Sequence, residues 1–285
     1  MIKEVMQPKL APIKIQSRIA KPKALTISVV IPVYNDLRIY KALESVLWQR
    51  NCQIELIVMD GGSKQPTLDV INRYREHIDI LVSEPDKGIF DAINKGIQRA
   101  TGDVIIALGA DDRFDHPDVF AQVTKLLTEQ PDLDGCFGDM VLVNDEDKVV
   151  RYWRNSDYHP LKLYFGWICP HFTLFLRRAV YAKCGLFNQT DYPITADFDF
   201  IMRILVKYKV KLGRIDDVLL RMTLGGNSNK SIQKVIKGNL ESIDSCKKQF
   251  HLAYVVHFFK LLRKASQLVA AKFYQDNTYR PTGLA

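Results

Sequence analysis

The chain has 285 residues, of which 47% are hydrophobic, and a formal net charge of +8, an ordinary globular composition with room for one large core. The basic excess would suit an anionic neighbour, but no cluster of basic and aromatic residues resembles an RNA- or DNA-reading motif, so nucleic acid is excluded as an expected partner. Five scattered cysteines without CxxC spacing argue against a disulfide framework or a zinc site, and no apolar stretch reaches the roughly 20 residues that span a bilayer, so we expect a cytoplasmic protein.

The first part of the chain predicts alternating strands and helices. Residues 1–25, with three prolines among scattered lysines, predict an extended basic arm. After it, short β-branched runs indicate strands, and apolar residues at helical spacing indicate helices. The expected order is strand 27–33, helix 37–48, strand 54–59, helix 67–74, strand 78–82, helix 89–100 and strand 104–108. This alternation is typical of an α/β fold with a parallel sheet and helices on both faces.

The second part of the chain is less regular. Its patterns predict helix 119–127, strands 135–144, 149–153 and 174–177, and helices 178–184 and 199–208. No linker separates the two parts, so we expect these elements to complete the same sheet. The predicted organisation is therefore one domain over residues 26–229, followed by a helical, basic extension over residues 230–285.

Polar residues follow three of the predicted strands, and ligands of parallel sheets bind beyond the carboxyl ends of the strands. Tyr34 offers an aromatic face for a nucleobase, or packs over the sheet edge. Asp60, before two glycines, offers a carboxylate where backbone can approach a ligand, or belongs to a tight turn. Asp111 and Asp112 indicate a divalent cation with a phosphorylated ligand, or a solvated turn before the next helix.

The segment 84–88 precedes a predicted helix. Lys87 could hold a diphosphate with the help of the helix N-terminus. Equally, Glu84 and Asp86 could only cap that helix and favour its dipole. No GxGxxG follows the first strand and no GxxxxGK[ST] occurs anywhere, which argues against a dinucleotide dehydrogenase and a P-loop enzyme.

A second acidic cluster, Asp197 and Asp199, begins a predicted helix. A carboxylate there could act as a general base toward a sugar hydroxyl, or cap the helix. His171 suits a metal ligand, a phosphate donor or a structural side chain. Asn227 and Ser228 lie in a glycine-rich polar loop that suits a lid or a plain linker.

The order of these motifs resembles a known family. The strings Ser28–Asn35, Val58–Ser63 and Glu84–Gly96, followed by Gly102-Asp103 before Asp111-Asp112, resemble family 2 glycosyltransferases of the GT-A fold. The likeness continues through residues 171–175, 196–200 and 225–228, and so covers roughly residues 26–245. It implies a Rossmann-like, mostly parallel sheet and an inverting enzyme that moves a sugar from a nucleotide diphosphate sugar to an acceptor hydroxyl.

The resemblance also implies roles in donor binding. Tyr34 would lie against the base, Asp60 would accept a hydrogen bond from the base edge, and Asp111 would sit near the ribose. Asp112 would bind Mg²⁺ or Mn²⁺ at the diphosphate, with Lys87 offsetting the same charge. The family's DxD occurs here as Ala110-Asp111-Asp112, so only two acids remain.

The resemblance matches Asp197 to the catalytic base, with Asp199 as its substitute. The frequent glutamate before the base is Ala196 in this chain. Two other functions stay open: a nucleotidyltransferase, and a catalytically inactive sugar-nucleotide binder that acts as an assembly partner.

The carboxyl-terminal segment 250–264 combines apolar and basic residues over a helical stretch. Such a helix could lie in a membrane interface, or pack on the domain with snorkelling lysines. The first alternative would place the protein peripherally at the inner face of the cell membrane, in contact with anionic lipid. A lipid-linked glycan would then be an attractive acceptor, as in bacterial surface polysaccharide assembly.

Overall fold

The computed structural model describes residues 24–224 and 232–249, together with six positions between 256 and 267. The predicted basic arm therefore lies outside the described residues, apart from its last two positions. The amino-terminal elements are β1 (Thr26–Val33), α1 (Ile39–Leu47), β2 (Gln53–Asp60), α2 (Gln65–Arg73), η1 (Arg75–His77), β3 (Ile80–Ser83), α3 (Ile89–Arg99) and β4 (Val104–Ala107). Every strand and helix predicted up to residue 108 is confirmed.

The elements that follow are shorter and more varied. They are β5 (Arg113–Phe114), α4 (Val119–Glu129), β6 (Gly135–Val143), β7 (Val149–Trp153), α5 (Pro160–Tyr164), η2 (His171–Thr173), β8 (Phe175–Arg177), α6 (Arg178–Cys184), α7 (Ala196–Met202), the π-helical η3 (Arg203–Lys207), β9 (Leu212–Thr223) and α8 (Ile232–Gln249). The predicted helix 199–208 is thus α7 continued by η3. The sequence patterns do not predict β9, because Asp216 and Asp217 interrupt its apolar residues and register shifts break its pairing with β6.

The strands that the structure describes form one curled sheet in the order β3-β2-β1-β4-β8-β6-β9-β5, with β7 paired to β6. The four strands β1 to β4 run parallel to one another. β8 then joins the two parts of the sheet by pairing antiparallel with both β4 and β6. The long pairing of β6 with β9 is again parallel. The expected α/β architecture, with one mostly parallel sheet shared by both parts of the chain, is confirmed.

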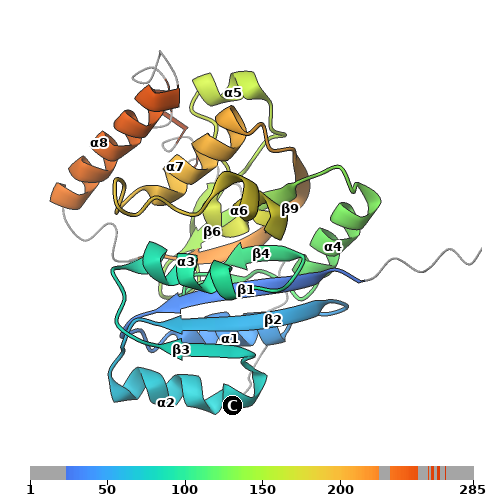
Figure 1. Cartoon of the computed structure of the whole chain (residues 1–285), viewed down its shortest axis with the longest axis vertical. Coiled ribbons are helices and arrows are strands. Elements are labelled where there is room, and N and C mark those ends of the chain that lie inside the picture. The colour runs from blue at the N-terminus through green and yellow to red at the C-terminus, as the bar shows by residue number, and fades with distance from the viewer. Residues whose placement is uncertain are drawn as a thin grey trace, which may run out of the picture.

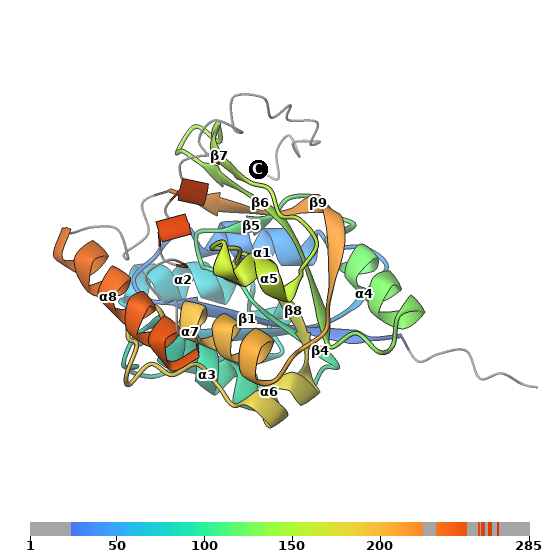
Figure 2. The ribbon, with the colours of Figure 1, turned by 90° about the horizontal axis from the view of Figure 1, so that it is seen from above.

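Helices cover both faces of the sheet (Figures 1 and 2). Successive residues of a strand point to opposite faces, so Val29 packs in the layer that contains α1 and α4, whereas Val30 packs in the layer that contains α3 and α7. Gly96 of α3 sits directly on Val30, where a Cβ would collide with the valine side chain. The helix α8 lies along α7 on the outside of the second layer.

All five cysteines are free thiols. Among the described residues, no helix has the length and apolar content needed to cross a membrane. The helix expected after residue 230 is present as α8, while most of residues 250–285 lie outside the described part of the chain.

Candidate active site

The loops that follow β1 and β2 meet at one edge of the sheet. Val33 and Asp60 are paired across these strands, and the Gly61 N–H donates to the Val33 carbonyl at 2.9 Å. Asn35 accepts from the Lys64 N–H at 2.8 Å through its side chain, in a left-handed conformation with φ 51° that asparagine tolerates. This turn leaves the Tyr34 ring 60% exposed at the edge. Tyr34 is therefore available for stacking by a flat ligand.

Asp60 is buried at the end of β2 and ties neighbouring loops together. Its carboxylate accepts from the Ser63 N–H at 3.1 and 3.2 Å and from the Ser83 hydroxyl at 2.6 Å. The next residue, Gly61, has no space for a Cβ because the Asp86 carboxylate lies against it. The structure thus brings Asp60 and Asp86 to the same edge as Tyr34, and gives Asp60 structural partners that the sequence did not reveal.

Lys87 is exposed beside the start of α3. Its backbone N–H donates to Asp91 at 3.1 Å, and the Gly88 N–H donates to Asp86 at 2.8 Å. Gly88 has φ 118°, a conformation that other residues rarely adopt, and it allows the sharp turn into the helix. Asp86 and Asp91 therefore shape this turn, and the Lys87 side chain extends from it into solvent.

Asp112, just beyond β4, is 2% exposed and is held by the end of β9. One of its carboxylate oxygens accepts from the Thr223 N–H at 2.9 Å, and the Thr223 hydroxyl donates to the Asp111 carbonyl at 2.6 Å. Two residues adjacent in sequence are thus fixed by a strand more than one hundred residues away. No local sequence pattern predicts this contact.

The adjacent carboxyl groups of Asp111 and Asp112 both have raised pKa values. Burial and, to a smaller extent, the negative charge of Asp111 together raise the pKa of Asp112 to about 8. Burial also raises the pKa of Asp111, while the guanidinium of Arg38 opposes that shift. The Arg38 Nη2 lies 3.0 Å from the Asp111 carboxylate. The pair is therefore a place where a cation lowers the electrostatic energy.

The carboxylate oxygens of the pair are the type of ligand that a hard divalent cation prefers. A Cβ at Gly109 would stand 2.5 Å from the Asp112 Oδ2 and 3.6 Å from the Asp111 Oδ1, so the glycine keeps room beside both carboxylates. Within the described residues, no group of three or more His, Cys, Asp or Glu side chains gathers as a complete metal site. An ion here would need further oxygens from a ligand, as Mg²⁺ does when it binds through carboxylates and substrate phosphates.

Asp197 and His171 lie close enough to interact. Asp197 is half-buried in the first turn of α7, and none of the side chains that the structure describes forms a hydrogen bond or an ion pair with it. Burial lowers the pKa of His171, against the opposite effect of the Asp197 charge. The His171 ring packs 4.9 Å from Phe172 and 5.0 Å from Phe187, between centroids. His171 thus packs against two aromatic rings, with the Asp197 charge near it.

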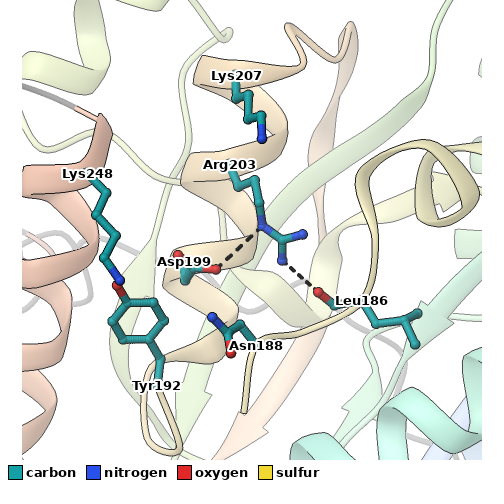
Figure 3. A pocket seen from close by; sticks show the side chains of 7 residues that line it. All are labelled: Leu186, Asn188, Tyr192, Asp199, Arg203, Lys207 and Lys248. Atoms are coloured by element: carbon teal, nitrogen blue, oxygen red, sulfur yellow. Dashed lines mark hydrogen bonds and ion pairs between the residues drawn. The ribbon is translucent and has the colours of Figure 1, made fainter. Parts of the chain in front are cut away.

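Asp199 points to the opposite side of α7. It is buried, accepts from the Ser245 hydroxyl of α8 at 2.9 Å, and lies 3.5 Å from the Arg203 Nε. Arg203 also donates to the carbonyls of Cys184 and Leu186. Asp199, Arg203 and Leu186 line a pocket of about 630 Å³ whose other walls include residues of α8 and η3 (Figure 3). The acids predicted together are thus separated, and Asp199 holds α7 to its neighbours.

The loop before α7 is held from both sides. Asn94 of α3 donates to the Phe187 carbonyl at 2.9 Å and accepts from the Phe187 N–H at 3.0 Å. On the other side, the Glu241 carboxylate of α8 accepts from the Ile194 and Thr195 N–H groups at 3.0 and 3.1 Å. These contacts fix the segment that leads into Asp197.

The sequence patterns did not predict the side chains that hold distant segments together, here called tethers. Asn94 lies in the string Glu84–Gly96 of the family resemblance, but no pattern pointed to its partner Phe187. Nor did any pattern point to Arg38, Thr223 or Glu241. Of the predicted site residues, Asn227 and Ser228 lie outside the described residues.

Comparison with protein families matches residues 28–184, more than half of the chain, to Glycosyl transferase family 2. The chain belongs to this family. A PGL/p-HBAD biosynthesis glycosyltransferase of Mycobacterium tuberculosis is 31% identical over 180 residues, which cover 62% of this chain and 68% of that one. Hyaluronan synthase of Pasteurella multocida is 26% identical over 213 residues, covering 73% of this chain and 21% of the synthase.

Solved structures of glycosyltransferases share the fold. TarS of S. aureus, residues 1–349 in complex with UDP-GlcNAc, superposes with a TM-score of 0.61 at 16% identity, covering 85% of this chain and 73% of that one. The mannosyltransferase PcManGT of Pyrobaculum calidifontis, in complex with GDP-Man and Mn²⁺, has the same TM-score and identity, covering 89% and 77%. The family 2 chain is thus a glycosyltransferase with the GT-A fold, as the order of its motifs indicated.

Proposed function

We propose that this family 2 protein is an inverting, metal-dependent glycosyltransferase that moves a sugar from a nucleotide diphosphate sugar to a hydroxyl of a lipid-linked glycan in surface polysaccharide assembly. The observation that carries the proposal is the carboxylate pair Asp111-Asp112, which lies at the same sheet edge as Tyr34 and Asp60. A nucleobase, a ribose and a diphosphate need an aromatic face, hydrogen-bond acceptors and positive charge respectively, and this edge offers all three.

The donor would be held by residues of the strand ends. Tyr34 stacks on the base, Asp60 accepts from the base edge, Asp111 lies near the ribose, and Lys87 neutralises part of the diphosphate at the start of α3. Asp112 would hold Mg²⁺ or Mn²⁺, which supplies positive charge to the departing nucleoside diphosphate. The complexes of TarS with UDP-GlcNAc and of PcManGT with GDP-Man and Mn²⁺ support this class of ligand.

The chemical step would depend on Asp197. Its carboxylate accepts the proton of the acceptor hydroxyl while the hydroxyl oxygen forms a bond to the anomeric carbon. The bond from that carbon to the diphosphate oxygen breaks on the opposite face, so one displacement inverts the configuration. The absence of a paired side chain among the described residues supports Asp197 as the base, whereas the Ser245 and Arg203 contacts of Asp199 favour a structural role.

Contact with a membrane would bring the protein to a lipid-linked acceptor. It is supported by exposed apolar side chains at α5 and in the carboxyl-terminal segment. Leu161 of α5, Phe165 directly after it and Phe258 are 63%, 57% and 58% exposed. The ring centroids of Phe165 and Phe259 are 5.4 Å apart, so the two segments are in contact. Together with the basic carboxyl-terminal segment, these apolar side chains would suit peripheral contact with an anionic membrane. Binding to anionic vesicles should fall in a Phe165→Ser Phe258→Ser variant. Undiminished co-sedimentation of that variant, or of a chain lacking residues 247–285, would refute this part of the proposal.

A donor panel tests the central proposal. UDP-, GDP- and dTDP-sugars are added to the protein with MnCl₂ or with EDTA, and the melting temperature is measured, because a bound ligand stabilises the folded state. One donor should stabilise the protein only with metal, and NMR of the hydrolysed or transferred sugar should show inverted configuration. Donor binding without any turnover would refute the enzyme and favour the catalytically inactive sugar-nucleotide binder. Retained configuration would refute the single displacement.

A further inference from the structure

Arg38 is the residue immediately before α1, and it lies between two acids. Asp36 holds its guanidinium through the Nε at 2.9 Å and the Nη2 at 2.6 Å, and also accepts from the Arg38 N–H at 2.9 Å. The same Nη2 lies 3.0 Å from the Asp111 carboxylate. The three bonds to Asp36 fix the position of the guanidinium, because a paired fork loses much of its rotational freedom. Arg38 is therefore preorganised to face Asp111.

The position of this guanidinium matters because the neighbouring acids repel one another. Asp111 and Asp112 are adjacent, and Asp112 is almost completely buried. Buried like charges are costly unless a cation is near. In the structure that cation is supplied by the chain itself. The side chains of Arg38 and Asp111 are 38% and 18% exposed, so the ion pair is accessible and can be exchanged for another.

We propose that Arg38 is the internal counter-ion of the Asp111-Asp112 pair and competes with the divalent cation for the Asp111 carboxylate. In the absence of donor, the guanidinium neutralises Asp111 and keeps the affinity for the metal low. A cation that enters must displace Arg38 from Asp111 or share the carboxylate with it, at the cost of repulsion between two positive groups. The metal is therefore bound well only when the donor diphosphate adds its own oxygens. This inference rests on the proposed function, since it assumes that the pair takes a metal.

The chain offers a matched control for this proposal. Lys41 lies on the first turn of α1, and its charge also acts on Asp111, but it forms no ion pair with it. A Lys41→Gln variant removes one positive charge from the same helix and keeps the Arg38 contact. It reports the general electrostatic effect, whereas an Arg38→Gln variant adds the loss of the direct competitor.

The test is binding of Mn²⁺ alone, measured from the free-ion signal in electron paramagnetic resonance. Arg38→Gln should bind Mn²⁺ about tenfold more tightly than the unmodified protein at low salt, and Lys41→Gln about twofold or less. Arg38→Lys, which keeps the charge without the fork, should fall between the unmodified protein and Arg38→Gln. In an Asp111→Asn background, the effect of Arg38→Gln should shrink to that of Lys41→Gln, because the shared carboxylate is gone.

Two results would overturn the inference. One is an Arg38→Gln variant whose Mn²⁺ affinity is unchanged or weaker, together with weaker binding in Asp111→Asn. That result would support a metal site at the pair but would refute competition by Arg38. The other is an equal gain in Arg38→Gln and Lys41→Gln, which would reduce Arg38 to a general charge. Failure of the proposed function would appear differently, as the absence of donor turnover in the unmodified protein. Unfolding by urea checks that each variant is folded.

Discussion

Residues 26–114 and residues 115–249 place their candidate site residues in different ways. In the first region, Asp60 ends its strand while Tyr34 and Asp111 follow theirs, and the parallel register brings the strand ends together. In the second region, Asp197 depends on a loop that is held by Asn94 of the first region and by a carboxylate of α8. Local strand geometry thus places Tyr34 and Asp60 on the proposed donor side, where a single strand of the second region, β9, holds Asp111 and Asp112. On the side of the proposed base, contacts between distant segments hold the whole loop that leads into Asp197.

The two regions should respond differently to mutation. A substitution at a strand end should change the affinity for one part of the donor. A substitution at a tether of the loop before α7, such as Asn94, should leave donor affinity intact. It should lower the rate of transfer, because it would shift the proposed base Asp197 relative to the acceptor.

The largest effect is expected for Asp197→Asn. Loss of a general base typically costs 10²- to 10⁴-fold, so transfer should fall about 10³-fold, while donor affinity stays within about twofold. Rates of sugar transfer and donor-induced shifts in melting temperature measure the two quantities. Asp199→Asn is the matched control and should act mainly through stability. If Asp197→Asn turned over normally, or if Asp199→Asn alone were inactive while stably folded, the assignment of the base would be wrong.

The second prediction concerns Arg221 of β9, whose buried side chain forms an ion pair with Asp115 beyond β5. The contact fastens β9 to the residue that follows β5. Arg221→Met should lower the free energy of unfolding by about 3 kcal/mol, because it leaves a buried charge without this partner. The double variant Asp115→Leu Arg221→Met should recover part of that loss. Urea unfolding of the three proteins measures both values, and equal stability of the single and double variants would contradict the explanation.

Asn94→Ala tests the tether directly. Loss of both hydrogen bonds to Phe187 frees the loop before α7, and kcat should fall about 30-fold, since small misplacements of reacting groups are costly. The KM for the donor should change little. Asn72→Ala, on an exposed face of α2, is the matched control and should be silent. A rise in donor KM with unchanged kcat would show that Asn94 belongs to the donor side after all.

Tyr34→Ala should change donor affinity and leave kcat unchanged, the reverse of Asn94→Ala. Base stacking on an aromatic ring contributes about 1–3 kcal/mol, so donor affinity should fall about tenfold while kcat at saturating donor is retained. Tyr34→Phe keeps the ring and should bind like the unmodified protein. A loss in Tyr34→Phe as large as that in Tyr34→Ala would assign the effect to the hydroxyl and not to stacking.

The smallest effect concerns His116 and Asp217, whose Nε2 and Oδ2 lie 3.1 Å apart. Burial alone would lower the pKa of His116, but Asp217 and other nearby acids raise it above the usual 6.5. A raised pKa means that the pair stabilises the fold fully below pH 6.5 and loses this contribution as the pH rises through the shifted value. The contribution is below about 1 kcal/mol because Asp217 is partly exposed.

Asp217→Asn should therefore reduce the free energy of unfolding more at about pH 5.5 than at about pH 8.5. Asp216→Asn is the control, because its partner Arg214 does not titrate in this range and its effect should be the same at both values. Equal losses for Asp217→Asn at the two values would show that His116 is not charged in the folded protein.

Much of the first region could be predicted from the sequence. The β-branched runs and helical spacing up to residue 108 correspond to observed strands and helices, because each element there obeys one simple period. In the second region, β9 escaped prediction. Its apolar residues are interrupted by two aspartates, and its pairing with β6 is broken by register shifts that no local pattern reports.

The family, the parallel first part of the sheet and the polar residues at its strand ends could be predicted from the chain alone, because motif order and strand–helix alternation are local properties of the sequence. Which side chains act together depends on the tertiary fold. Thr223 reaches Asp112 across 111 positions and Asn94 reaches Phe187 across 93. The partner of a hydrogen bond between distant segments depends on how the layers pack, and packing is a property of the whole fold.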